Sequence, residues 1–563
     1  MPDKRSTLAD AVARHVRAGD VLHPVVGHTR WTAATREVVR QWWGRDPGFT
    51  LVMLSLSSLG ALFFRGGLVR RVVTGYSGDT FPNFTPNPWF AQAYERGDVE
   101  VEHWSFLAFT QRLEAGARGL PAVTTRSIAG SSMEGNRAYA RVETPFGAIG
   151  LVEALRPDVA LLHAPMADRE GNVALHPPLL EGVWGALGAT RGAIVTVERV
   201  VDDIRPWSHF VRIPGHRVLA IVEAPLGAHP GGLYTGSLPV DGYGEDYEFW
   251  VEARAATRRD DYDEWIRHWI LDVETQEQWV ERLGGERVTA LRTKAAPDSW
   301  RAEQRLRPDL EREPNAWERA AVWGARALAD RIEHVGFDAV LAGAGVANLA
   351  AWLGVQLARE RGCDVHLTAE IGLWGYDATP ADPFVLNHRN FPTATMLGDA
   401  ETVLGTLVGG PGTRVLGCLG GAQVDELGNV NSTTLVPEGG PFLVGSGGGN
   451  DVASTADACV VVATLTPART PRRCAYVTSP GRAVDALVTD HGILSKRASG
   501  GPLELTAVPA GDEPLSDRIA RARAQCGWDL AVAPDVAELP DVTRAEVAAL
   551  RRWDPQGWFL RAR

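Results

Sequence analysis

Glu370 is the residue best placed for chemistry, because a short apolar stretch precedes it and a glycine-rich turn follows it. Residues Asp364–Ala369 have the length and apolar content of a buried strand, so we expect Glu370 at the carboxyl end of that strand. Open α/β sheets bind their ligands at this edge. The glycines of the next segment, residues 371–375 (IGLWG), would let another chemical group approach the carboxylate closely.

Three interpretations of Glu370 remain open on this local pattern. Its carboxylate is a catalytic nucleophile or acid/base, a hydrogen-bond partner of a nucleotide ribose, or a solvated residue at a strand end. The ribose interpretation rests on residues 343–348 (GAGVAN), which resemble a dinucleotide-binding fingerprint followed by an acid about 20 residues later. Against it, Asn348 occupies the place of the third glycine.

The elements that would position Glu370 alternate between strand and helix. Phe337–Ala342 is a predicted strand, Asn348–Arg359 carries apolar residues at helical spacing, and Asp364–Ala369 is the next strand. The first part of the chain shows the same alternation, with a helix predicted at Thr32–Trp43 and a strand at Val69–Thr74. This order predicts parallel α/β layers.

The sequence also contains an internal duplication. Asp168–Val173 and Asp425–Val430 share the pattern Asp-x-x-Gly-Asn-Val, and each lies between two apolar strands. Their separation suits a duplicated domain and is too long for a solenoid repeat. We interpret the shared pattern as a turn that the aspartate side chain stabilises.

A polar segment with several prolines, residues 291–314, separates the two copies and is interpreted as a linker. The predicted domains are therefore residues 1–290 and residues 315–563, and only the second contains Glu370. A helix is expected from about Asn315 to Glu333.

The composition disfavours several classes of protein. The chain has 563 residues, of which 45% are hydrophobic and 22% charged, as in an ordinary globular protein. Its net charge of −12 disfavours nucleic-acid binding, and no apolar run suggests a secretory signal or a membrane span. Its five cysteines form no C-x-x-C pattern, which disfavours a disulfide framework or a zinc site. We expect a cytoplasmic protein without a metal site.

Several motifs follow one another in the second half: GAGVANLAAWL (343–353), AEIGLWGY (369–376), DPFVLNHRNFPTA (382–394), GGAQVDELGNVNST (420–433) and GSGGGNDVAS (445–454). Together they resemble the β subunit of class I CoA-transferases of the glutaconate CoA-transferase kind. The first half resembles the α subunit through residues 104–127, 168–174 and 222–234. The resemblance implies two similar open α/β/α domains of the CoA-transferase (NagB/RpiA-like) type, fused in one chain.

In that family the glutamate of an E-x-G-x-x-G motif is the nucleophile, and here that residue is Glu370. The resemblance implies attack of Glu370 on an acyl-CoA thioester, followed by a glutamyl-CoA thioester that passes CoA to a small carboxylic acid. It implies no permanently bound cofactor, since coenzyme A is part of the substrate. It also implies a homodimer or a homotetramer.

The resemblance further assigns residues around Glu370. The oxyanion and CoA sites are expected at two glycine turns and their neighbours, namely Gly345, Val346, Gly372, Gln423, Gly447, Gly448, Gly449 and Asn450. Polar residues at predicted strand ends or loops are weaker candidates for substrate binding: Ser77, Arg126, His229 and Arg389. Three aromatic residues, Trp374, Phe391 and Phe442, are candidates to shield the glutamate from water.

Two departures from the family pattern leave other functions open. A related ring-cleaving hydrolase of steroid catabolism carries its catalytic acid in the α half, where this chain has Ser105 and Phe106. The predicted loop His23–Arg30 is not glycine-rich, as such loops usually are, and could reshape the acceptor pocket. The second hypothesis is therefore an acyl-CoA hydrolase or a carbon–carbon bond hydrolase on the same fold. The third is a ligand sensor or a nucleotide-binding module.

Overall fold

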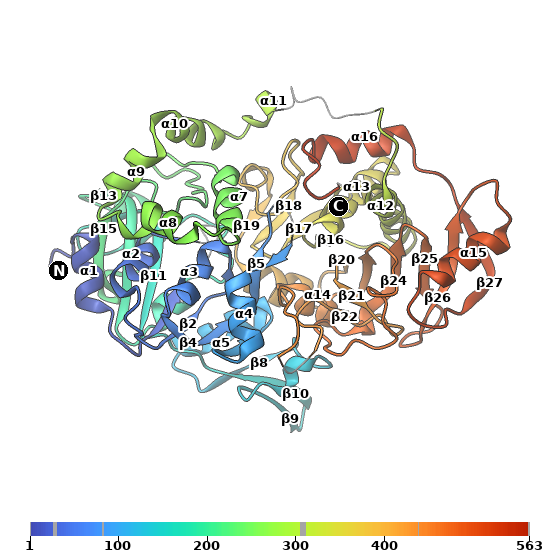
Figure 1. Cartoon of the computed structure of the whole chain (residues 1–563), viewed down its shortest axis with the longest axis horizontal. Coiled ribbons are helices and arrows are strands. Elements are labelled where there is room, and N and C mark those ends of the chain that lie inside the picture. Colours follow the sequence, from blue (N-terminus) through green and yellow to red (C-terminus); the bar gives the residue numbers. More distant parts are fainter. Residues whose placement is uncertain (1, 26–30, 82–83, 304–310, 437–438, 561–563) are drawn as a thin grey trace.

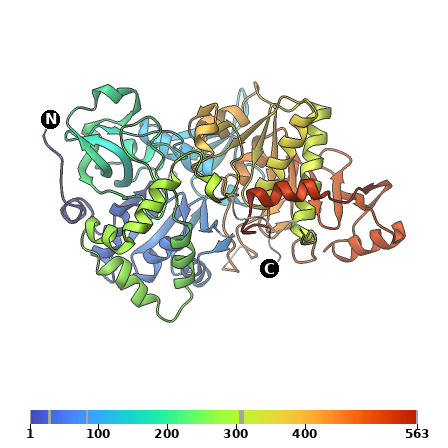
Figure 2. The same ribbon diagram turned by 90° about the horizontal axis from the view of Figure 1, so that it is seen from above.

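The computed structural model describes residues 2–25, 31–81, 84–303, 311–436 and 439–560. Within them, two large open sheets stand next to each other, one built from the first half of the chain and one from the second (Figure 1). Figure 2 shows the same arrangement from above, with helices packed around each sheet.

The first sheet is parallel in its centre. Its parallel strands lie in the order β7 (Glu100–His103), β4 (Val69–Thr74), β2 (Phe49–Val52), β1 (Val21–Pro24), β11 (Val159–Asp168), β13 (Gly192–Val201) and β15 (Val218–Glu223). The short antiparallel strands β12 (Val173–Ala174) and β14 (Val211–Ile213) extend it. The helices of this half are α1 (Leu8–His15), α2 (Ala33–Trp42), α3 (Ala61–Arg65), α4 (Pro88–Arg96), α5 (Phe106–Ala117) and α6 (Trp184–Gly188).

The second sheet has a parallel centre with antiparallel strand pairs on both sides of it. Its strands lie in the order β19 (Met396–Leu397), β18 (Leu373–Tyr376), β17 (His366–Ala369), β16 (Ala339–Ala342), β20 (Val415–Leu419), β23 (Ala458–Val462), β24 (Val484–Thr489), β25 (Gly492–Lys496), β26 (Leu503–Pro509) and β27 (Val532–Leu539). The last pair, β26 and β27, is again parallel. Its helices are α12 (Ala316–Val335), α13 (Val346–Glu360), the π-helix at Glu401–Val408, α14 (Gly449–Thr455), α15 (Leu515–Ala524) and α16 (Arg544–Trp553).

The two sheets share one topology. The parallel strands of the first follow the order β2-β1-β11-β13-β15, and those of the second follow the matching order β17-β16-β20-β23-β24. In each half a helix, α2 or α13, comes after the first strand of the set. The predicted fold class, two similar open α/β units, is confirmed.

The duplicated turns have the predicted role. Asp168 Oδ1 accepts the backbone N–H of Asn172 at 2.9 Å, and Asp168 Oδ2 accepts the Asn172 side chain at 2.7 Å. In the second half, Asp425 Oδ1 and Oδ2 accept the same two groups of Asn429, both at 3.0 Å. The aspartate therefore holds the turn in both copies.

A lysine supports each of these turns at the same place. The amide oxygens of Asn172 and Asn429 accept the N–H groups of Gly215 and Gly481, each at the start of a short 3₁₀ helix. The ammonium groups of Lys4 and Lys496 donate to the carbonyls of the same two glycines, each at 2.5 Å. Two of the three lysines in the chain thus have matching structural positions.

The region between the sheets contains more helix than a linker suggests. Helices α7 (Tyr247–Ala256), α8 (Tyr262–Ile266), α9 (Gln276–Leu283) and α10 (Gly285–Lys294) follow the first sheet, and α11 (Trp300–Glu303) lies inside the predicted linker. The helix expected after it is present as α12, with Asn315 and Glu318 forming a capping box. The domain boundaries themselves stay a prediction.

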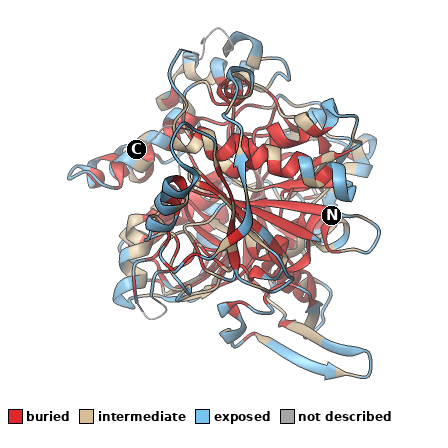
Figure 3. Ribbon diagram, turned by 90° about the vertical axis from the view of Figure 1, so that its right-hand side faces the viewer, coloured by how far each residue is buried: buried red, intermediate tan, exposed pale blue. Residues whose placement is uncertain are grey.

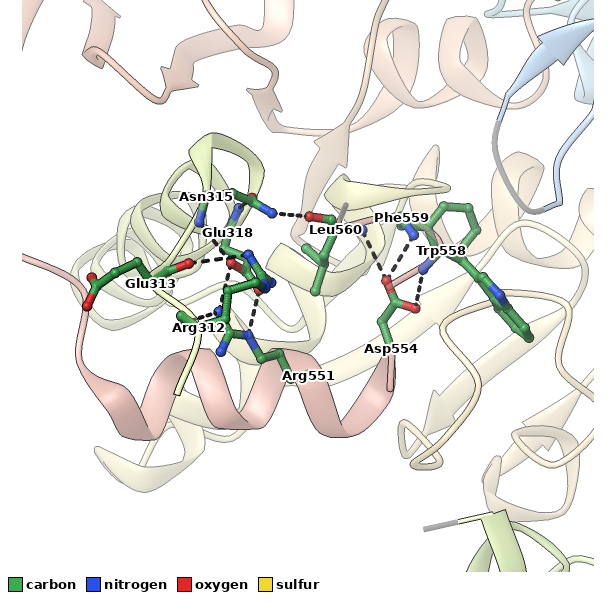
Figure 4. Close-up of polar contacts among 9 residues, drawn as sticks. All are labelled: Arg312, Glu313, Asn315, Glu318, Arg551, Asp554, Trp558, Phe559 and Leu560. Carbon is green, nitrogen blue, oxygen red and sulfur yellow. Dashed lines mark hydrogen bonds and ion pairs between the residues drawn. The ribbon is translucent and has the colours of Figure 1, made fainter. Parts of the chain in front are cut away.

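The end of the chain is fastened to the start of the second half (Figure 4). Arg551 on α16 donates to both carboxylate oxygens of the fully buried Glu318, at 2.7 and 3.1 Å. Asp554 accepts the backbone N–H groups of the turn that follows, from Trp558 to Leu560. These contacts hold α16 against α12.

Burial follows the expected pattern, with the central strands buried and an exposed arm projecting from the first half (Figure 3). The arm consists of β8 (Ala122–Thr125), β9 (Tyr139–Thr144) and β10 (Gly147–Glu153), with Phe146 at its tip. Among the described residues, no helix is both long enough and apolar enough to cross a bilayer.

Candidate active site

Glu370 follows β17 directly, at the carboxyl edge of the second sheet. Strands β16 and β17 are parallel neighbours, with Leu341 opposite Thr368. The turn after β16, which contains Gly343 and Gly345, therefore lies at the same edge as Glu370, as predicted. The matching position after β2 in the first half is Met53, which is buried and apolar, so only the second half carries an acid here.

The glycine loop, residues 445–451, sits on the first half of the chain. The N–H of Gly447 donates to the carbonyl of Gly75 at 3.0 Å, and the carbonyl of Gly447 accepts the N–H of Phe106 at 3.1 Å. Asn450 Oδ1 accepts the N–H of Ile128 at 2.9 Å. The loop thus belongs to the second half in sequence but is held by residues of the first.

Gly448 lies directly against the carboxylate of Glu370. A Cβ atom placed on Gly448 would overlap Glu370 Oε2, whereas the backbone there is ordinary, with φ −82°. The N–H of Gly448 lies close enough to the Glu370 carboxylate to favour its charged form. A glycine is therefore required at this position by close approach and not by backbone strain.

The environment of Glu370 disfavours its charge. The residue is only partly exposed. Burial of the carboxylate, together with the negative charge of Asp451, raises the pKa of Glu370 to about 7, against the opposing effect of the Gly448 N–H. Near neutral pH the glutamate thus exists in both protonation states, as a group that reacts at such a pH should.

Asp451, on the first turn of α14, is the second acid of the site and is fully buried. Its Oδ2 accepts the N–H of Leu107, at the amino end of α5, at 3.0 Å. Burial raises the pKa of Asp451 to about 6, although the neighbouring N–H groups and the hydroxyls of Ser105 and Ser127 favour its charged form. The ring-cleaving hydrolase carries its catalytic acid at the position that Ser105 and Phe106 occupy here. In this chain an acid of the second half, Asp451, lies beside that position.

Three other predicted oxyanion residues already use their donor groups in hydrogen bonds to the protein. The N–H of Gly447 is taken by Gly75, and the N–H of Gly449 donates to Ser446 O at 3.1 Å. Asn450 donates its side-chain amide to Thr478 O at 2.9 Å. Of these residues, Gly448 is the one whose N–H favours the charged form of Glu370.

The remaining members of that set lie around the same sheet edge. Gly372 packs against the backbone of Gly398, with φ 111°. Gly345 is the N-cap of α13 and faces the ring of Phe84 from the first half, and Val346 is the first residue of that helix. The N–H groups of a first helical turn have no partner within the helix, which suits an anion site.

Gln423 has structural contacts. Its side chain donates to Ala468 O at 3.1 Å and accepts from the side chain of Asn431 at 3.0 Å. Its contact with CoA stays a prediction.

The weaker substrate candidates do not gather at one place. Ser77 is buried at the junction, where its N–H donates to Val444 O at 2.7 Å. Arg126 is exposed after β8. His229 is buried in the core of the first half, where its Nε2 lies 2.9 Å from Asp246 Oδ2. Arg389 is buried in a loop near Asp382; burial raises the pKa of Asp382, and the charge of Arg389 partly opposes that rise.

Two of the three aromatic candidates pack the junction between the halves. Phe391 meets Tyr234 edge-on at 5.4 Å, and Phe442 stacks on His103 at 5.6 Å. Trp374 is only partly buried and lies on β18, beside β17. The predicted loop His23–Arg30 is in part strand, since His23 is buried in β1 with its Nδ1 2.8 Å from Val52 O, and residues 26–30 lie outside the described residues.

Within the described part of the chain, no group of three His, Cys, Asp or Glu side chains could hold a metal ion. Asp451 is the functional candidate that sequence reasoning missed. Its only signal in the sequence is its position directly after the run Gly447–Asn450. That position does not reveal that the first half would bury it.

The chain is similar in sequence to known coenzyme A transferases. The family model described as coenzyme A transferase matches residues 5–224. Over 283 residues the chain is 30% identical to one subunit of the 3-oxoadipate CoA-transferase of Pseudomonas knackmussii, covering 47% of this chain and 92% of that one. It is 26% identical to one subunit of the glutaconate CoA-transferase of Acidaminococcus fermentans, covering 51% and 94%.

Two further matches bear on function and fold. The IpdA subunit of a cholesterol ring-cleaving hydrolase of Rhodococcus jostii is 29% identical, covering 44% of this chain and 84% of that protein. The crystal structure of the acyl-CoA transferase YdiF from Escherichia coli O157:H7 has the same fold, with a TM-score of 0.65 over 97% of both chains at 17% identity. From its match to nearly the whole of the P. knackmussii protein, we conclude that this chain belongs to the coenzyme A transferase family.

Proposed function

We propose that this chain transfers CoA from an acyl-CoA to a small carboxylic acid, with Glu370 as the nucleophile. The observation that carries the proposal is the close approach of Gly448 to the Glu370 carboxylate, at a sheet edge enclosed by both halves of the chain. Its raised pKa also makes the ionised Glu370 more basic, and hence a better nucleophile, than an ordinary glutamate.

The proposed reaction exchanges acyl bonds without hydrolysis. Glu370 attacks the thioester carbonyl, which forms an acyl-glutamyl anhydride and expels CoA thiolate. The thiolate then attacks the glutamyl carbonyl, which forms the glutamyl-CoA thioester and releases the first carboxylate. An acceptor carboxylate repeats the two steps in reverse and leaves as its CoA ester, so that Glu370 is regenerated.

The Gly448 N–H would act on the second of these steps. When the thiolate attacks the glutamyl carbon, negative charge develops on a carboxyl oxygen of Glu370 itself. The Gly448 N–H lies near that group and favours negative charge on it. A donor already aimed at this position lowers the energy of the tetrahedral intermediate without reorganisation.

A hydrolase is the second candidate, and the similarity to the ring-cleaving hydrolase favours it. Kinetics separate the two. A transferase should show parallel initial-rate lines at several acceptor concentrations, and acyl-CoA alone should yield one equivalent of acid per site and then stall. A hydrolase would release acid and free CoA continuously without an acceptor.

The direct test is mass spectrometry of the protein after incubation with a panel of acyl-CoAs. A CoA adduct on the peptide containing Glu370 would establish the thioester. Steady acyl-CoA turnover in water, unaffected by added carboxylates and without an adduct, would reject the transferase in favour of the hydrolase.

A further inference from the structure

The role of Asp451 is not explained by the packing of the glycine loop. Its carboxylate is fully buried and crosses from α14 to the amino end of α5, where Oδ2 accepts the Leu107 N–H at 3.0 Å. Its Oδ1 is buried without a partner in hydrogen-bonding geometry, although the Ser105 and Ser127 hydroxyls are close enough to lower its pKa. A buried carboxylate with an unpaired oxygen is costly, so its presence calls for a reason.

Capping of α5 is not a sufficient reason. Ser105 is already the N-cap of that helix, and its hydroxyl accepts the Ala108 N–H at 3.3 Å. A neutral asparagine could accept the Leu107 N–H as well as an aspartate does. What only an aspartate supplies is a negative charge, and that charge acts on Glu370.

The position of Asp451 connects it to Glu370 through one short segment. Gly448 contacts the Glu370 carboxylate, and Asp451 follows three residues later in the same loop and helix start. The hydrogen bond to Leu107 fixes one end of this segment, and the Gly447 contacts with Gly75 and Phe106 fix the other. The Gly448 N–H is thus held between two anchors, both on the first half.

We propose that Asp451 is a positioning residue for Glu370, which fixes the Gly448 segment on the first half and places a second negative charge beside the nucleophile. The repulsion between the two carboxylates is relieved when Glu370 becomes a neutral anhydride or thioester. Asp451 would thereby destabilise the resting enzyme relative to the acylated one and favour formation of the intermediate. This inference rests on the proposed role of Glu370.

The other ionisable groups on the elements packed against α14 have different partners. On α5, Arg112 pairs with Glu102, and Glu114 pairs with Arg118 at 2.6 Å. Glu401, on the π-helix, lies beside Glu114. Cys418 and Cys459, on β20 and β23, are buried with strongly raised pKa values and are neutral. Arg482, in the 3₁₀ helix that also packs there, is exposed. Asp451 is therefore the charged side chain that acts on Glu370 among the described residues.

The first test is the pH profile of kcat/KM for D451N, compared with the wild type and with D457N. Asp457 lies just beyond α14 and only accepts the Val415 N–H at 2.8 Å, so its variant is a matched control. Loss of the Asp451 charge should move the acidic limb, where Glu370 ionises, to lower pH by about one unit. The limb of D457N should stay in place. An unmoved limb in D451N would overturn the proposal, because a purely structural role changes the rate and not the limb.

The second test does not depend on catalysis. Thermal unfolding of the wild type, D451N, E370Q and the double variant at pH 8 measures whether the two charges interact. We expect the stabilisation by the double variant to be smaller than the sum of the single effects, because either substitution removes the same repulsion. Additive effects would overturn the inference even if a CoA adduct forms on Glu370. Non-additive effects without a CoA adduct would reject Glu370 as the nucleophile but would still support the repulsion between Asp451 and Glu370.

If D451N does not fold, D451S takes its place, because serine removes the charge with a smaller polar side chain that leaves no bulkier amide to bury. Failure of both neutral variants to fold at pH 6–8 would mean that the charge serves the fold, and would overturn the proposal.

Discussion

Gly448 and Glu370 are in such close contact that no side chain fits between them. A Cβ on Gly448 would overlap Glu370 Oε2, yet it would lie 3.5 Å from Glu370 Cβ, which is an ordinary contact. The conflict is thus confined to the carboxylate. This makes the pair suitable for a double-mutant cycle.

Gly448→Ala should lower kcat by about 100-fold or more, because it displaces the carboxylate by roughly an ångström. It should also destabilise the wild-type protein. In a Glu370→Ala background the same substitution should be neutral or stabilising by up to about 1 kcal/mol, since the backbone at Gly448 suits alanine. Chemical denaturation of the four proteins measures this. An equal cost in both backgrounds would mean that the two residues do not touch.

Glu370→Gln should abolish exchange and stabilise the protein above neutral pH. The folded-state pKa of Glu370 lies above its ordinary value, so below about pH 4.5 the wild type and the variant should be equally stable. As the pH rises through 7, the wild type alone bears a buried charge and should lose up to about 3 kcal/mol relative to the variant, less in proportion to its partial exposure. Melting temperatures at pH 5 and pH 8 check this. A variant that is no more stable at pH 8 would contradict the burial of the charge.

Glu370→Asp should also fail in exchange, because it withdraws the carboxylate by about 1.5 Å from the attacking position. Unlike the glutamine variant, it keeps the charge. Single-turnover measurements with acyl-CoA should show no adduct on either variant, and a normal adduct on the aspartate variant would show that the site tolerates such a displacement.

Glu401→Gln should stabilise the junction between the halves at alkaline pH. Burial, together with Glu114 and Asp399, raises the pKa of Glu401 to about 7. Protonated Glu401 therefore contributes to the stability of the folded protein at low pH, and this contribution is lost as the pH rises through 7. The glutamine variant should have the higher melting temperature at pH 8 and an equal one at pH 5. A constant difference at both values would assign the effect to packing.

Residues 1–300 and 305–563, expressed separately, should be inactive and should regain activity when mixed. The reason is that the glycine loop beside Glu370 is held by the other half of the chain. Its hydrogen bonds join Gly447 to Gly75 and Asn450 to Ile128. Asn450→Ala in the second piece should raise the concentration needed for recovery by about tenfold or more, because it removes side-chain hydrogen bonds to buried backbone groups. Activity from the second piece alone would contradict a site shared by both halves.

The sequence patterns predicted the local geometry well where it depends on strand order. The turn at Gly345 and the acid at Glu370 had to share an edge, because parallel strands joined by one helix end on the same side. The Asp168 and Asp425 turns were predictable because their hydrogen bonds are local. His229 was a poor candidate, since a position near a strand end does not reveal burial against Asp246.

The contacts across the junction could not be predicted in the same way. That Gly447 donates to Gly75, and that Asp451 reaches Leu107, depends on how two separate sheets pack. No periodicity in either segment records the surface of the other. The long-range part of the site therefore required the structure.

The junction that holds the Gly447–Asp451 segment joins two parts of a single polypeptide, and this changes its energetics. A connecting chain gives docking an effective concentration that can reach the millimolar range, so hydrogen bonds too weak to hold free subunits together can suffice. The polar contacts of Ser77, Ile128 and Leu107 at this surface are of that moderate kind. Hydrogen bonds can thus supplement the aromatic contacts of Phe391 and Phe442 in holding the two halves together, and the docking of one half on the other does not depend on protein concentration.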